Sequence, residues 1–151
     1  MKDLHEAEFV RDYNVSVARL WAAVTEPSEI VQWFGPEGVE LKECVMNFSQ
    51  LGAWTCTMRG LESGQLFKVS GGVTSVNPPA KASPGSVGFT WAWHDDDDKR
   101  GVESHVTFTV SETASGARLV LHHRNLPDLE AAQSHSRGWL STLSKIDKLL
   151  G

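Results

Sequence analysis

The fold is decided by the stretch DLEAAQSHSRGWLSTLSKIDKLL, residues 128–150, which predicts one long amphipathic helix after Pro127. Asp128 is the expected N-cap of this helix. An apolar seam recurs every three or four residues, through Ala132, Ser136, Trp139, Leu143, Ile146 and Leu150, with Leu140 beside it. At ~1.5 Å per residue, roughly 22 residues make a helix of about 33 Å, which is long enough to cross a whole sheet.

Gly138 lies inside this predicted helix, where glycine costs about 1 kcal/mol relative to alanine. Two explanations are open at this point. The helix backbone approaches the sheet closely there, or the helix has a slight kink.

Upstream of the helix, seven segments alternate between apolar and polar residues, as half-buried strands do. They are residues 8–15, 39–48, 53–59, 66–76, 86–93, 102–110 and 117–123. Between the first two, Ser16 can cap a short helix over residues 17–24, and Pro27 suits the first turn of another. Within residues 66–76, the Gly71-Gly72 pair predicts a bulge or a sharp bend.

Consecutive strands with short connections imply an antiparallel sheet. One face of this sheet is rich in aromatic residues, and the C-terminal helix is the only element long enough to cover it. We therefore expect an α+β fold of the helix-grip type, in one domain over residues 1–151. A curved antiparallel sheet of about six or seven strands should wrap around the C-terminal helix, with two short helices after the first strand.

Composition excludes several classes of function. The net charge is −5 over 151 residues, and no basic stripe is available to neutralise nucleic-acid phosphates. No apolar run is long enough for a membrane span or a signal peptide, so we expect a cytoplasmic protein without membrane contact. Exposing the large apolar area of six tryptophans to water would be unfavourable, so we expect these side chains to be buried. They predict either an aromatic core or the wall of a pocket.

The sequence carries no nucleotide-binding, zinc-protease or serine-hydrolase motif, so no catalytic residue, metal or cofactor is expected. His122 and His123 are neighbours on a strand and point to opposite faces, so they cannot share a metal. His123 falls on the inner face, either satisfied by backbone groups or acting as a polar handle for a ligand. Cys44 and Cys56 fall on adjacent strands and can meet. Because a disulfide directly across two strands is strained and the expected compartment is reducing, we predict two free, buried thiols.

Residues 91–101, WAWHDDDDKRG, contain metal-ligand residue types and a protease-like DDDDK sequence. Trp91 and Trp93 end one inward-facing strand and Val102 begins the next. The stretch between them is therefore predicted to be a hairpin connection, where water screens the four aspartates from one another.

Five segments, in order, resemble the activator-of-heat-shock-protein-90-ATPase homologue-like family, which belongs to the START-like, or SRPBCC, helix-grip superfamily. They are VARLWAAVTEPSEIVQWFGPEG (17–38), LGAWTCTMRG (51–60), VNPPAKA (76–82), VGFTWAW (87–93) and GWLSTLSKIDKLL (138–150). The resemblance covers nearly the whole chain and implies the helix-grip fold. The superfamily hosts lipid binders, cyclases, hydratases and co-chaperones on one scaffold, so the family name does not define a function.

A helix laid across a curved sheet leaves volume beneath it. An empty void of ~300 Å³ would cost roughly 7 kcal/mol, which rivals the stability of a typical domain, so such a space holds side chains, water or ligand. The resemblance favours a pocket for a small hydrophobic molecule. Its predicted lining is Trp33, Phe34, Trp54, Met58, Phe89, Trp91, Phe108, Leu121, His123, Trp139 and Leu143. The alternatives are a chaperone- or stress-linked interaction module and, third, a cyclase- or hydratase-like enzyme that uses His123 or a cysteine.

Overall fold

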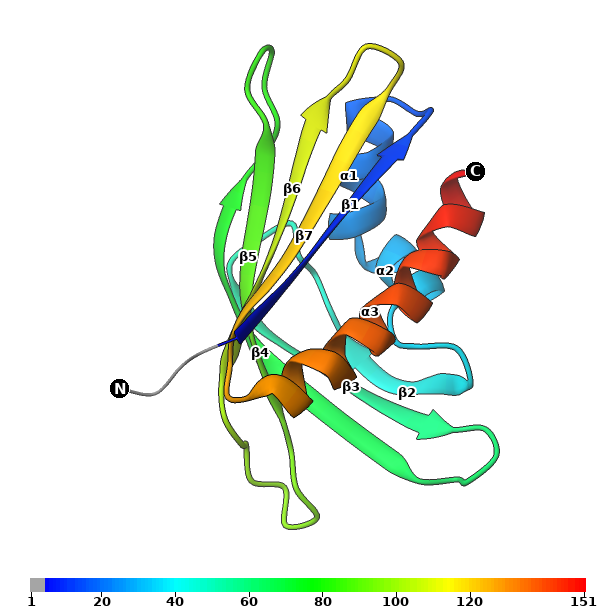
Figure 1. The fold of residues 1–151 in the computed structure, drawn as a ribbon, viewed down its shortest axis with the longest axis vertical. Coiled ribbons are helices and arrows are strands. Elements are labelled where there is room, and N and C mark those ends of the chain that lie inside the picture. The colour runs from blue at the N-terminus through cyan, green and yellow to red at the C-terminus, as the bar shows by residue number, and fades with distance from the viewer. Residues whose placement is uncertain (1–4) are drawn as a thin grey trace.

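The computed structural model describes residues 5–151, in which seven strands form one antiparallel sheet curved around a long helix (Figure 1). In chain order the elements are β1 (His5–Tyr13), α1 (Val17–Thr25), α2 (Pro27–Trp33), β2 (Val39–Val45), β3 (Gly52–Gly60), β4 (Leu66–Asn77), β5 (Gly85–Trp93), β6 (Ser104–Glu112), β7 (Ala117–Leu126) and α3 (Leu129–Leu150). The strand order is β1-β7-β6-β5-β4-β3-β2, and the three helices lie on the concave side. The predicted helix-grip fold is confirmed.

The helices begin where the local sequence signals predict. The Ser16 hydroxyl accepts the backbone N–H of Arg19 at 3.1 Å at the start of α1. Pro27 occupies the first turn of α2, where its missing N–H costs nothing. The Asp128 carboxylate accepts the N–H of Ala131 at 2.7 Å and caps α3.

The connection between β5 and β6 is the predicted hairpin loop, with one difference at its end. His94 and Arg100 form an isolated bridge, and the N–H of Gly101 donates to the carbonyl of Trp93 at 2.8 Å. These bonds keep the chain in the loop beyond Gly101, so β6 begins at Ser104 rather than at Val102. The expectation that Val102 joins the inner face is wrong, since it is 63% exposed.

The core is an aromatic cluster between the sheet and the helices. The Phe48 and Phe89 rings stack with centroids 4.4 Å apart, and Trp54 meets Phe89 edge-on at 5.6 Å. Phe108 joins Phe89 to Trp139 on α3 through edge-to-face contacts of 5.4 and 6.2 Å. Such geometries add to the burial of apolar area, which is the main driving force for closing α3 onto the sheet.

The buried face of α3 differs from the predicted seam on one side. Ala132, Trp139, Leu143 and Ile146 are buried as expected, and Thr142 is buried with them. Leu140 is 48% exposed, so it lies outside the buried stripe of α3. Within residues 5–151, no helix has the length and apolar character needed to cross a membrane.

The prediction of two free thiols is wrong, because Cys44 and Cys56 form a disulfide between β2 and β3. The two residues are direct partners in the antiparallel register, and their Cα atoms lie 4.1 Å apart. The predicted placement of the two cysteines on adjacent strands, where they can meet, is confirmed. Direct pairing of the two residues across the ladder outweighs the strain on which the prediction of free thiols rested.

Thiol titration tests this bond. Unfolding in denaturant without a reductant should expose no reactive thiol, and reduction should release both. The disulfide closes a loop with a sequence separation of 12. Reducing it should lower the free energy of unfolding by about 3 kcal/mol. A Cys44→Ser/Cys56→Ser double variant is the matched control, because it should show the same loss of stability without any response to reductant. Two reactive thiols in unreduced, denatured protein would contradict the assignment.

Candidate functional site

A cavity of about 330 Å³ lies between the first half of α3, the ends of β3, β4 and β5, and the loop after α2. Its lining is mostly apolar and aromatic. The residues are Phe34, Gly35, Pro36, Val39, Met58, Phe67, Trp91, Trp93, Ser134, His135, Gly138, Trp139 and Thr142. This volume is at the lower end of the roughly 300–1,000 Å³ typical of small-molecule sites.

Four of the eleven predicted site residues line this cavity: Phe34, Met58, Trp91 and Trp139. The other seven lie deeper, within the packed core behind the cavity wall, and each is 2% exposed or less: Trp33, Trp54, Phe89, Phe108, Leu121, His123 and Leu143. Strand alternation identified the inner face correctly, but the side chains of this second set fill the space against one another.

His123 is one of the seven, and it is satisfied by side chains rather than by the backbone. Its Nδ1 accepts the indole N–H of Trp139 at 2.9 Å. The neutral ring therefore carries its proton on Nε2, which lies 2.6 Å from the hydroxyl of Ser104, and that hydroxyl in turn lies 3.4 Å from the carbonyl oxygen of Trp91. Burial, followed by the nearby His135, lowers the pKa of His123 to about 3. Both ring nitrogens are thus used in joining α3 to β6 and β7.

The sequence pattern did not identify His135, a polar side chain that lines the cavity. It lies between Ala132 and Trp139, one helical turn from each, so the period of the α3 seam could have found it. Its Nε2 accepts the indole N–H of Trp93 at 3.4 Å, and its ring lies 4.5 Å from that of His123. Burial lowers the pKa of His135 to about 4, so the ring is neutral at physiological pH.

The cavity wall is therefore uncharged. Among residues 5–151, no Asp, Glu, Lys or Arg lines it, and its polar side chains are Ser134, His135, Thr142 and the indoles. The buried Nε1 of Trp91 has no hydrogen-bond partner within residues 5–151. An unpaired buried N–H of this kind is costly.

Gly138 leaves room in the cavity rather than allowing a close approach of the helix. A Cβ built on this residue meets no atom within 4 Å, and Gly138 is part of the lining. The explanation by close approach to the sheet is therefore wrong. A side chain here would project into space that the cavity now occupies.

A seven-stranded antiparallel sheet around a C-terminal helix, with an apolar cavity between them, defines a protein of the START-like, or SRPBCC, helix-grip class. Residues 14–151 match the family model described as Activator of Hsp90 ATPase homolog 1-like protein, and the chain belongs to this family.

Solved structures of similar proteins agree with this placement. The AHSA1 protein from Silicibacter pomeroyi is 44% identical, with a TM-score of 0.88 over 97% of each chain. A protein from Chromobacterium violaceum is 20% identical, with a TM-score of 0.81 over 96% of each chain, and shows the likeness of fold alone. A Mycobacterium smegmatis protein of 20% identity has a TM-score of 0.75, over 99% of this chain and 96% of its own. No functionally curated protein matches the chain.

Proposed function

We propose that the protein binds a small, mainly apolar molecule in the cavity between α3 and the sheet. The observation that carries this proposal is the uncharged, aromatic-lined cavity of about 330 Å³. An empty space of this size would be costly to maintain, so it is occupied by water or by a ligand. Ligand binding on the same scaffold elsewhere in the superfamily supports the second of these.

The polar groups at the cavity define the ligand further. His135 Nε2 accepts from Trp93, so the neutral ring carries its proton on Nδ1 and can act as a donor. This donor favours a ligand with an acceptor, such as a carbonyl or ether oxygen, on an apolar body. A ligand carboxylate or ammonium would find no countercharge in the lining.

Two half-exposed aromatic side chains at the cavity suggest where the ligand enters. Phe67 is 37% exposed and Trp93 is 38% exposed, although both belong to the lining. Leu66, next to Phe67 at the start of β4, is 62% exposed. An apolar mouth of this kind favours entry of an apolar molecule, because the molecule begins to lose contact with water before it reaches the cavity.

Filling the cavity tests the proposal. Gly138→Leu should weaken binding of the fluorescent apolar probe N-phenyl-1-naphthylamine at least about tenfold, because the new side chain occupies the site. Arg137→Leu places the same side chain at the neighbouring exposed position and should leave affinity unchanged. Gly138→Ala should raise the free energy of unfolding by about 1 kcal/mol, since alanine is the better helix former and has room.

Native mass spectrometry of the freshly purified protein, looking for a co-purified small molecule, complements the titration. Binding should also quench tryptophan fluorescence and raise the melting temperature by mass action. If Gly138→Leu and the parent protein bind the probe equally, and neither carries a small molecule, the cavity is not a ligand site. The role of the protein would then be sought in a chaperone- or stress-linked partner.

The structure gives no support to an enzyme that uses His123 or a cysteine. Both nitrogens of His123 have partners, and Cys44 and Cys56 are bonded to each other, so neither supplies a free base or thiolate. We retain the cytoplasm as the proposed location. The disulfide must then persist in a reducing compartment. Thiol titration of freshly isolated protein tests whether it does.

A further inference from the structure

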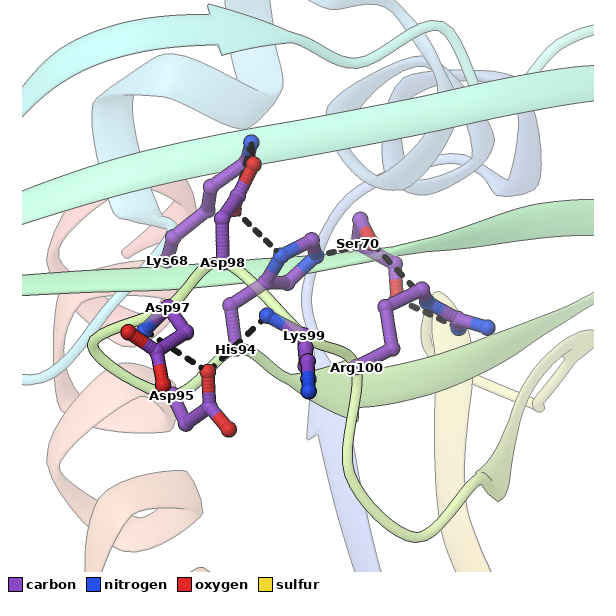
Figure 2. A network of polar contacts seen from close by, with 8 residues as sticks. All are labelled: Lys68, Ser70, His94, Asp95, Asp97, Asp98, Lys99 and Arg100. Carbon is purple, nitrogen blue, oxygen red and sulfur yellow. Dashed lines mark hydrogen bonds and ion pairs between the residues drawn. The ribbon is translucent and has the colours of Figure 1, made fainter.

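The acidic loop after β5 is tied to β4 by a chain of three side chains on the convex face of the sheet (Figure 2). The Asp98 Oδ1 lies 2.7 Å from Nδ1 of His94, and the Nε2 of His94 lies 2.6 Å from the Ser70 hydroxyl. The site is on the face of the sheet opposite to the cavity, because Ser70 alternates with the buried Val69. It is therefore independent of the proposed ligand site.

The loop is shaped to present Asp98. The Asp95 carboxylate accepts the backbone N–H groups of Asp97 and Lys99, each at 2.9 Å. Asp98 itself has a positive φ of 62°, a left-handed conformation that costs energy for a non-glycine residue and recurs at functional sites. Lys68, then His94, lowers the pKa of Asp98, so this residue is a carboxylate that accepts the Nδ1–H of His94.

That proton assignment leaves Nε2 of His94 as an acceptor for the proton of Ser70. Arg100 enforces it, because its Nε donates to the Ser70 oxygen at 3.1 Å and so turns the hydroxyl proton towards His94. Nucleophile, base and orienting carboxylate are thus in hydrogen-bond reach of one another, with Nδ1 on the carboxylate and Nε2 on the hydroxyl, as a serine triad requires.

We propose that Ser70, His94 and Asp98 form a triad that transfers the acyl group of small activated esters to Ser70. The Ser70 oxygen attacks the ester carbonyl carbon while its proton passes to Nε2 of His94. The bond to the leaving oxygen then breaks, and that oxygen takes the proton from His94. Water attacks the resulting acyl-serine, gives one proton to His94, and releases the carboxylic acid as His94 returns the proton to Ser70.

A groove on this face provides access and charge stabilisation. It is lined by Ser70, His94 and Arg100, by the charged side chains of Lys68 and Glu103, and by small or apolar residues such as Ala53 and Gly72. Arg100 also donates to Glu103 and to the carbonyl oxygen of Ser70, which holds its guanidinium beside the hydroxyl. The guanidinium can therefore donate to an oxyanion formed at the Ser70 acyl carbon.

The experiment treats the full chain with p-nitrophenyl acetate, follows p-nitrophenol release, and maps the acetyl group by peptide mass spectrometry after an acid quench. The parent protein should carry one acetyl group on Ser70. Ser70→Ala should lose this label, and both Ser70→Ala and His94→Gln should slow p-nitrophenol release about 100-fold. Asp98→Asn should slow it about tenfold, which is less than for a buried triad carboxylate, because Asp98 is largely exposed.

His122→Gln is the matched control. His122 pairs with Glu6 at 3.0 Å, so it is also an imidazole beside a carboxylate on the protein surface, and its removal should leave the rate unchanged. Circular dichroism and urea unfolding establish that each variant is folded. A parent protein without acetyl on Ser70, or a Ser70→Ala variant that releases p-nitrophenol as fast as the parent, would overturn the proposal. The network would then serve only to anchor the loop to β4.

Discussion

Gly71→Ala should lower the free energy of unfolding by about 3–5 kcal/mol, which is a large part of the stability of a domain of this size. A Cβ on Gly71 would overlap the carbonyl oxygen of Thr90 on the neighbouring strand β5. That oxygen accepts the buried indole N–H of Trp54 at 3.0 Å. Relieving the overlap must therefore separate β4 from β5 locally and disturb a hydrogen bond of the aromatic core.

Gly72→Ala is the control, because it is the next residue and the same chemical change. A Cβ on Gly72 meets nothing closer than the carbonyl oxygen of Gly52, at 4.0 Å. The free energy of unfolding should therefore change by less than about 1 kcal/mol. Urea unfolding of the two variants, followed by tryptophan fluorescence, gives the comparison. Equal losses at the two positions would show that Gly71 does not lie against Thr90.

Acidification should destabilise the protein well above the pH at which carboxylates titrate. His123 has a pKa lowered to about 3 in the folded state, against an ordinary value of 6.5, first by burial and then by the charge of His135. Between these values the unfolded chain binds a proton at this residue and the folded chain does not. The free energy of unfolding is therefore fully retained above pH ~6.5 and falls as the pH falls, by about 5 kcal/mol over the whole interval.

The geometry gives the same direction as the pKa. A proton on Nδ1 of His123 would face the indole N–H of Trp139, so two donors would meet where one bond of 2.9 Å now joins β7 to α3. His135 adds to the effect, because burial lowers its pKa to about 4. Asp12 and Asp98, whose pKa values are lowered by Arg118 and by Lys68 respectively, lose their contributions below their ordinary value of 3.8. The interval from pH about 4.5 to about 6.5 therefore reports mainly on these two histidines, together with His105, whose pKa is also lowered by burial.

His123→Gln isolates the larger contribution. A glutamine amide can accept from Trp139 and donate to Ser104 but does not titrate, so the slope of stability against pH should flatten in this interval. His122→Gln removes the neighbouring, outward-facing histidine of β7 and is the matched control for the loss of an imidazole from this strand. Urea unfolding at pH values between about 4.5 and about 7 measures both. A parent protein whose stability is constant over that range would show that His123 is not held neutral in the core.

Much of the architecture follows from local sequence. Apolar and polar residues alternate along residues 53–59, and apolar residues recur every three or four positions along α3. Each period is that of a single strand or helix that buries one face, so it predicts the element before any contact is known. Caps at Ser16 and Asp128 act within one helical turn, and the structure confirms both. The order of these elements, with no long connection between successive strands, then leaves the antiparallel helix-grip as the arrangement that covers the aromatic face.

Only the tertiary structure decided which of the predicted inner-face residues border open space. The inner face is a property of alternation, but the position of the cavity depends on how far the curved sheet stands from each turn of α3. Phe34, Trp91 and Trp139 therefore line the cavity, whereas Phe89 and Phe108 have the same pattern and are packed behind it.

The remaining features depend on distances between atoms that are far apart in the sequence. Gly71 and Gly72 are indistinguishable along the chain until β5 places the Thr90 carbonyl against one of them. His123 could be a ligand contact or a structural residue until Trp139 and Ser104 take its two nitrogens. Likewise, the sequence of the acidic loop predicts only a turn. Packing of this loop against β4 brings Asp98, His94 and Ser70 within hydrogen-bond distance of one another. The packing of distant elements against one another sets these distances, and no local pattern of residues encodes them.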